Sequence, residues 1–377
     1  MGNIFSLRAA EDNWQSYTQY AMDSDWFCVV CGGPFNLEGE VYNLDSKERS
    51  YQWLFDFRLL GNLSDMLNHR VTGEDAHPAN LSDSDDVFLS DKAWFSMTYT
   101  GYFCVGDAYG GEIWFDALRK ERNSGTLIAL HDACISISCR VIEHLQTTRK
   151  DNEKTSSLLI LNKTLQDRFR NGAHRSPRKD RDLLDLGTTS KTFGPRSVLA
   201  LNRLEWWGGY FEKFYTNPIH IPNLTCFAME ILHASPNMKD VEKETPHSKR
   251  EPQGIERLPN ELIDHICTYL PAPACIALHR VSKRLFNKVP LDTSFWRNSL
   301  LSGNLLPHIW DLDKNELQLP ALESTKDWRT VARLLETKRF AISECDARLD
   351  DIPNGLWNRC RIWSIMEEAF DDHVSRS

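Results

Sequence analysis

Proline spacing divides one part of the chain into three short helices, and this feature constrains the fold more than any other. Pro259 favours a helix start, and Pro271 cannot continue that helix, because proline lacks the backbone N–H that a helix interior uses. A second helix is expected from Pro273. A third is expected between the N-cap Ser282 and Pro290. Three helices in about 35 residues enclose little interior, so we expect some of their apolar surface to contact another chain.

Apolar side chains recur at helical spacing within these segments. In the first helix Leu262, Ile266 and Leu270 lie one turn apart and form a seam. The second helix directs three more apolar residues toward a core or a partner, namely Ile276, Leu278 and Val281. The pattern therefore predicts a small all-α unit.

These segments resemble the F-box family. The family pattern begins Leu-Pro-x-Glu-Leu, passes through a Leu-Asp-Pro-like break and ends with Trp near an acidic-serine turn. The matching elements here are Leu258–Leu262, Leu270–Pro273, Val281–Leu285 and Ser294–Arg297. The chain departs from the pattern at Ala274-Cys275, where the family commonly has Asp-Leu, and at Leu285, where it often has Trp.

The resemblance implies an F-box over residues 254–300 that binds a Skp-family adaptor and, through it, a cullin. The implied Skp-facing residues are Leu258, Pro259, Leu262, Ile266, Leu278, Val281 and Leu285. The chain would then be a non-catalytic subunit that presents an unidentified substrate protein for ubiquitination. Two alternatives stay open. The segment is an internal piece of a larger helical domain, or the chain is a structural or regulatory protein that binds Skp outside the ligase.

Two short cysteine motifs form a candidate metal site. Cys28 and Cys31 stand two residues apart before a pair of glycines, which is the form of a zinc knuckle. His131 and Cys134 lie one turn apart in the first turn of a predicted helix over residues 131–144, so both can bind the same ion. The sequence therefore predicts one structural zinc held by these four residues.

Other interpretations of the cysteines remain. They are buried apolar side chains while His131 caps its helix, or the ligand set includes Cys104 or Cys139. A zinc-dependent enzyme is a further alternative for the whole chain, and it requires an open coordination position. Phosphate loops, dinucleotide fingerprints and His-Glu-x-x-His are absent from the sequence, so we expect no enzyme.

The order of motifs also resembles a group of fungal F-box proteins. Those proteins carry Cys-x-x-Cys-Gly-Gly-Pro-Phe, His-x-x-Cys and Trp-Gly-Gly before the F-box. This chain has the three elements at Cys28–Phe35, His131–Cys134 and Trp207–Gly209. The resemblance implies no particular substrate.

Composition and patterning together predict an α+β fold. The chain has 377 residues, long enough for two or three domains at roughly 150 residues each. Aromatic and β-branched runs such as Glu112–Phe115 predict short strands, and the segments around 328–335 and 356–370 predict amphipathic helices. The expected parts are a flexible N-terminus (1–20), an α+β domain (21–232) with a mobile insertion near 171–191, a linker (233–253), the F-box (254–300) and a helical C-terminal region (301–377).

Net charge and hydropathy limit which kinds of partner and which cellular location we expect for the chain. A formal charge of −9 argues against a nucleic-acid binder, because such proteins usually present a basic surface to phosphate. No stretch reaches the roughly 18 consecutive apolar residues of a membrane span, and the N-terminus lacks the apolar core of a secretory signal. We therefore expect a cytoplasmic or nuclear protein.

The first six residues match the pattern for N-myristoylation, with Gly2 as the acylated residue and Ser6 completing the motif. A single myristoyl chain gives only marginal, reversible membrane binding, so attachment would need a second signal. The alternative is an unmodified, disordered N-terminal tail.

Overall fold

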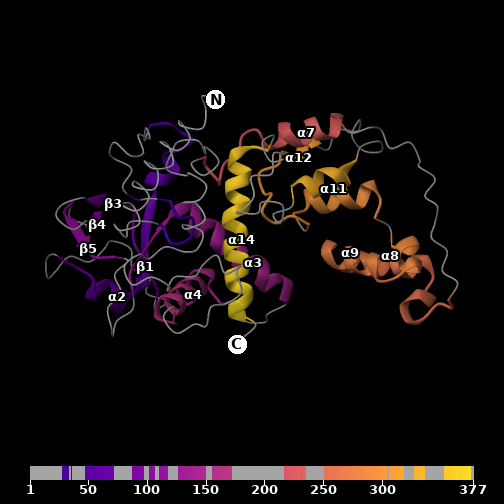
Figure 1. Cartoon of the computed structure of the whole chain (residues 1–377), viewed down its shortest axis with the longest axis horizontal. Coiled ribbons are helices and arrows are strands. Elements are labelled where there is room, and N and C mark those ends of the chain that lie inside the picture. The colour runs from indigo at the N-terminus through magenta and orange to yellow at the C-terminus, as the bar shows by residue number, and fades with distance from the viewer. Residues whose placement is uncertain are drawn as a thin grey trace, which may run out of the picture. The chain divides into compact units, whose positions relative to one another are not determined.

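The computed structural model describes residues 28–33, 35, 47–71, 87–96, 102–106, 110–117, 126–149, 155–171, 216–234, 250–289, 291–303, 305–317, 327–335 and 352–374. Strands and helices are both present, so the predicted α+β class is confirmed (Figure 1). The chain divides into two compact units. Unit 1 comprises Met1–His220 with Phe340–Ser377, and unit 2 comprises Ile221–Arg339.

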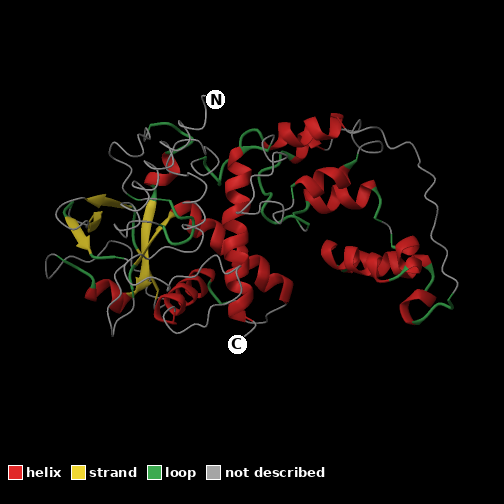
Figure 2. Ribbon diagram, in the orientation of Figure 1, coloured by secondary structure: helices red, strands yellow, loops and turns green. Residues whose placement is uncertain are grey.

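Within the described residues, unit 1 contains one sheet of six antiparallel strands (Figure 2). They are β1 (Phe57–Asn62), β2 (Val87–Leu89), β3 (Ala93–Ser96), β4 (Tyr102–Gly106), β5 (Glu112–Phe115) and β6 (Ile128–His131). Strand β1 lies inside the sheet, because Leu60 pairs with Leu89 of β2 and also with Ile128 of β6. From β1 the sheet continues through β3 and β4 to β5, the strand predicted over residues 112–115.

The helices of unit 1 come from both the N-terminal and the C-terminal parts of the sequence. They are the short η1 (Gln52–Phe55) and the α-helices α2 (Leu63–Asn68), α3 (Asp132–Arg149), α4 (Ser157–Asn171) and α14 (Asn354–Val374). The helix predicted over 131–144 is α3, but it begins one residue later than expected. His131 is instead the last residue of β6, because its backbone pairs with Phe57 of β1.

Helix α14 differs from its prediction. Its sequence suggests an amphipathic segment in a C-terminal region, whereas α14 belongs to unit 1, where it packs along α3 and contacts α4 (Figure 1). Every residue from Leu356 to Trp363 is buried, including Asn358, Arg359 and Arg361. These polar side chains donate hydrogen bonds to acceptors inside the unit, so they do not mark a solvent-facing side.

All the regular secondary structure in the described residues of unit 2 is helical. Its helices are α7 (Leu224–Ala234), η3 (Gly254–Arg257), α8 (Asn260–Tyr269), α9 (Ala272–Val281), α10 (Lys283–Lys288), α11 (Thr293–Leu301), α12 (Lys314–Leu317) and α13 (Trp328–Leu334). Helix α7, which the sequence groups with the N-terminal domain, packs on α12 and α13. Thr225 of α7 accepts a hydrogen bond from the N–H of Asp313 at 2.9 Å, which helps explain this grouping.

The three helices predicted from proline spacing are α8, α9 and α10. Pro259 and Pro271 are the N-caps of α8 and α9. The Ser282 hydroxyl accepts the N–H of Leu285 at 3.2 Å and caps α10, as expected of an N-terminal serine. Helix α9 starts at Ala272, one residue before the predicted Pro273, because proline is tolerated within the first helical turn.

Some expectations concern residues outside this description. Gly2, most of the insertion near 171–191 and the Trp207–Gly209 motif lie there. Among the helices that are described, none combines the length and the hydropathy needed to cross a membrane.

Candidate functional site

Residues 28–33 form a tight turn that presents two thiols. The N–H of Gly32 donates to the carbonyl of Cys28 at 2.8 Å, and the N–H of Cys28 donates to the carbonyl of Gly33 at 2.8 Å. Gly32 has a φ of 75°, a conformation that glycine adopts without a steric cost. The Sγ atom of Cys31 also accepts the N–H of Gly33 at 3.2 Å. The turn therefore orients its thiols through its own backbone.

The second pair of side chains comes from the junction of β6 and α3. His131 ends the strand and Cys134 lies in the first turn of the helix. The imidazole packs against two buried aromatic rings, with ring centroids 4.9 Å from Phe35 and 5.3 Å from Trp53. Strand pairing and aromatic packing thus hold the imidazole in place.

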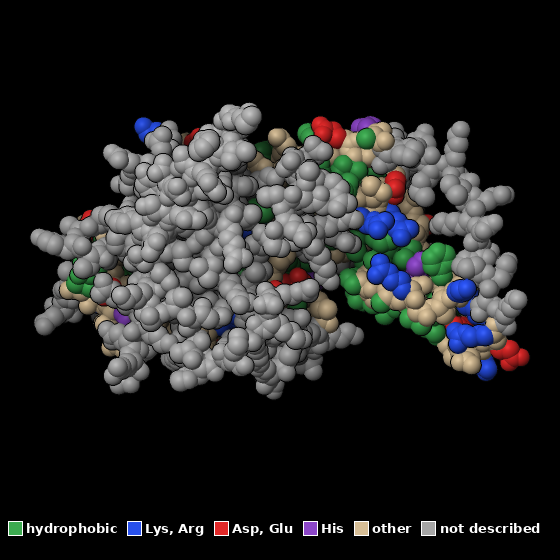
Figure 3. All heavy atoms as spheres, viewed as in Figure 1, with side chains coloured by type: hydrophobic (Ala, Val, Ile, Leu, Met, Phe, Trp, Pro, Cys, Tyr) green, Lys and Arg blue, Asp and Glu red, His purple; other side chains and the backbone are tan. Residues whose placement is uncertain are grey.

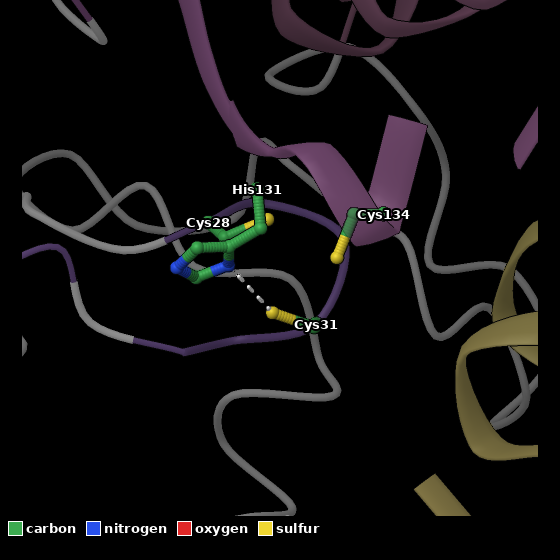
Figure 4. A group of neighbouring side chains, drawn as sticks. All are labelled: Cys28, Cys31, His131 and Cys134. Carbon is green, nitrogen blue, oxygen red and sulfur yellow. Dashed lines mark hydrogen bonds between the residues drawn. The ribbon is translucent and has the colours of Figure 1, made fainter. Parts of the chain in front are cut away.

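The two pairs converge on one point (Figure 4). One ligand atom from each of Cys28, Cys31, His131 and Cys134 lies within 4.8 Å of the other three, and all four residues are buried. The Nδ1 atom of His131 lies 3.3 Å from Sγ of Cys31. Tetrahedral Zn–S bonds of about 2.3 Å place sulfur atoms roughly 3.8 Å apart, so separations within 4.8 Å are on the scale of a metal site. The cluster could therefore bind a metal ion such as zinc.

The charges within the cluster are strongly linked. Burial alone would raise the pKa of Cys28, but hydrogen bonds from Cys134 and Cys31 and the charge of His131 hold it well below its usual value. Burial alone would lower the pKa of His131, yet the charges of Cys31 and Cys28 raise it to about 10. Burial, followed by hydrogen bonds to those two thiols, raises the pKa of Cys134. A bound metal cation would displace protons from these side chains, because cysteine binds a metal as the thiolate and histidine binds it as the neutral imidazole.

Neither cysteine of the alternative ligand sets joins this cluster among the described residues. Burial and then the charge of Glu112 raise the pKa of Cys104 to about 11. Burial and then the charge of Glu143 do the same for Cys139. Both thiols therefore lie outside the candidate metal site.

The Cys/His cluster has a neighbour that the sequence did not reveal. The Nη1 atom of Arg361, on α14, donates to the carbonyl of Cys31 at 2.8 Å. Arg361 lies 330 residues beyond Cys31, in a segment whose pattern predicts only an amphipathic helix. No local signal distinguishes it from a surface arginine.

Three of the residues that the F-box resemblance assigns to Skp binding contribute to the interior of unit 2. Leu285 is buried in a small core with Ile263 and Val289, and Leu258 and Leu278 pack against that core. These side chains support the arrangement of α8, α9 and α10.

The other four lie nearer the surface. Ile266 is half-buried and Pro259 is exposed. Leu262 and Val281 are 49% and 71% exposed, so both are accessible at the surface of the unit. Sequence reasoning missed two more exposed apolar residues on these helices, Tyr269 and Phe286. In the space-filling view, hydrophobic side chains reach the surface over α8 and α9 (Figure 3).

Comparisons of the chain with models of protein families, with curated proteins and with solved structures give no match.

Proposed function

We propose that this chain is an F-box adaptor that binds a Skp-family protein through α8, α9 and α10. In this proposal the bound Skp protein links the chain to a cullin-type ubiquitin ligase, and the chain presents a substrate protein for ubiquitination. The observation that carries the proposal is the exposure of Leu262 and Val281 on helices that coincide with the F-box-like motifs. Catalysis would belong to other subunits of the ligase.

Packing supports a partner at these helices. Among the described residues, the small hydrophobic core of these helices is built around Ile263, Leu285 and Val289. Apolar residues of similar size on α8 and α9 remain exposed, including Leu262 and Val281. Burying one aliphatic side chain contributes about 1.5–3 kcal/mol, so a partner that covers this face would gain substantial affinity.

The proposed metal is one structural zinc. Cys28, Cys31, His131 and Cys134 supply four ligands, which complete a tetrahedral site. A catalytic zinc keeps one position open for water or substrate, so this ligand set favours a structural role over the zinc-enzyme alternative. The ion would join the turn at residues 28–33 to the start of α3 and so stabilise unit 1.

Adaptor binding is tested with a charge placed on the exposed face. The full chain carrying Leu262→Asp should recover at least about tenfold less purified Skp protein than wild type, because a carboxylate would be buried at the interface. Leu67→Asp is the matched control, since Leu67 is 51% exposed but lies on α2 of unit 1. Failure of the wild type to bind, or equal recovery by Leu262→Asp, would exclude the proposal.

The regulatory alternative differs in the fate of bound proteins. Affinity purification of the chain with and without proteasome inhibition separates the two functions. A ligase adaptor should retain substrates that accumulate under inhibition, and its complex should contain a cullin. A Skp-binding protein outside the ligase should give the same partners in both conditions.

A further inference from the structure

Arg361 connects the C-terminal helix of unit 1 to the metal-binding turn. Its side chain is almost completely buried. The Nη1 atom donates to the carbonyl of Cys31 at 2.8 Å, and Nη2 donates to Oδ1 of Asn358, one helical turn earlier, at 2.9 Å. The bond to Asn358 orients the guanidinium, and the bond to Cys31 connects it to a candidate metal ligand.

The positive charge of Arg361 lies next to the Cys/His cluster. The guanidinium contacts the backbone of Cys31 and is buried with the three candidate cysteine ligands. Moving a charged group out of water costs several kcal/mol unless opposite charge compensates it. Three thiolates that hold a metal ion in the same buried region would provide such compensation.

The four ligands determine the net charge of a metal ion bound at this site. A divalent ion with three thiolates and one neutral imidazole carries a net charge of −1. One buried guanidinium brings that total to zero. We propose that Arg361 is the charge-balancing and positioning residue of the metal centre: it neutralises the metal–thiolate group and holds the turn at Cys31 in its ligating conformation. The inference rests on the zinc site proposed above.

A consequence is that metal binding and the packing of α14 support each other. The ion holds the turn and the β6–α3 junction together, and Arg361 attaches α14 to the same turn. Coupling between two binding events is reciprocal, so a bound ion should also stabilise α14 against local opening. The centre would then join three segments that lie far apart along the chain.

The same helix provides a matched control. Arg359 is also completely buried, but its Nε donates to the carbonyl of Pro218 at 2.6 Å and its Nη2 donates to that of Ile219 at 2.9 Å. Loss of either arginine should destabilise unit 1. Only loss of Arg361 should act on the affinity for the ion.

The experiment compares the full chain as wild type, Arg361→Met, Arg361→Lys and Arg359→Met. Zinc affinity is measured by competition with a chromophoric chelator. Arg361→Met should weaken zinc binding by about 10–100-fold, the usual effect of losing a group that supports metal ligands. Arg361→Lys keeps the charge and should recover most of that loss, whereas Arg359→Met should leave the affinity near that of wild type.

Equal affinities of Arg361→Met and Arg359→Met would overturn the proposal, and so would a loss in Arg361→Lys as large as in Arg361→Met. Hydrogen exchange of α14 in the wild type adds a test that needs no variant. Zinc should slow this exchange, and unchanged exchange would count against the inference. A wild-type chain that binds no zinc would instead refute the metal site itself.

Discussion

Leu262 and Ile263 are adjacent on α8, yet Leu262 is 49% exposed whereas Ile263 is completely buried. The two residues therefore separate folding from partner binding. Ile263→Ala should destabilise the α8–α10 core by about 2–5 kcal/mol, because it leaves a cavity beside Leu285 and Val289. Leu262→Ala should change the stability by no more than about 0.5 kcal/mol.

Hydrogen exchange of residues 260–288 in the full chain measures this difference. Ile263→Ala should speed exchange throughout α8, α9 and α10, and Leu262→Ala should leave it unchanged while it weakens Skp binding. Similar exchange rates in the two variants would contradict the assignment of Ile263 to the core and of Leu262 to the exposed face of α8.

Purified wild-type chain should contain about one zinc ion, as expected for a closed four-ligand site. Cys134→Ser should lose that zinc, because it removes one of the four convergent ligands. Cys139→Ser is the control, since Cys139 lies on the same helix outside the cluster. Atomic emission on the three proteins measures the content, and stoichiometric zinc in Cys134→Ser would contradict the ligand assignment.

Gly33 lies so close to the candidate ligands that an added side chain would crowd them. A Cβ atom at this position would lie 3.0 Å from Cε1 of His131 and 3.2 Å from Sγ of Cys31, so at least one ligand would have to shift. Gly33→Ala should therefore weaken zinc binding by about tenfold or more. Gly106→Ala is the control, because a Cβ there meets no described atom within 4 Å. Equal zinc affinities in chelator competition would show that the turn tolerates the shift.

Alkaline pH should destabilise unit 2 through Cys275. Burial and then the charge of Cys267 raise the pKa of the Cys275 thiol from about 9 to about 11. Below pH 9 the thiol is protonated in both the folded and the unfolded chain, and its contribution to stability is fully present. Above pH 9 the unfolded chain loses this proton first, so the free energy of unfolding should fall until about pH 11.

Urea unfolding followed by circular dichroism across that pH range measures the effect. Cys275→Ala should show a smaller fall in unfolding free energy than wild type. Cys226→Ser, which changes an exposed cysteine of α7, should retain the wild-type fall. The same slope in all three proteins would show that Cys275 does not cause it.

Local sequence determined much of the secondary structure. Prolines and Ser282 define the ends of α8, α9 and α10, because they act on backbone groups within one helical turn. Strand β5 was likewise predicted from its own four residues. The spacing within Cys28–Cys31 and His131–Cys134 was enough to predict two pairs of candidate metal ligands, since each pair needs only a local turn or helix.

Tertiary structure decided how these parts are used. The two ligand pairs meet because β6 pairs with β1 and because the aromatic rings around His131 pack together, and these contacts join residues far apart in sequence. Packing alone also selects Ile263 rather than Leu262 for the core, since both are apolar residues of the same helix. The position of Arg361 depends on the packing of α14 along α3, which no pattern within the helix encodes. Local propensity acts over a few residues, whereas burial and ligand convergence depend on which distant surfaces come together.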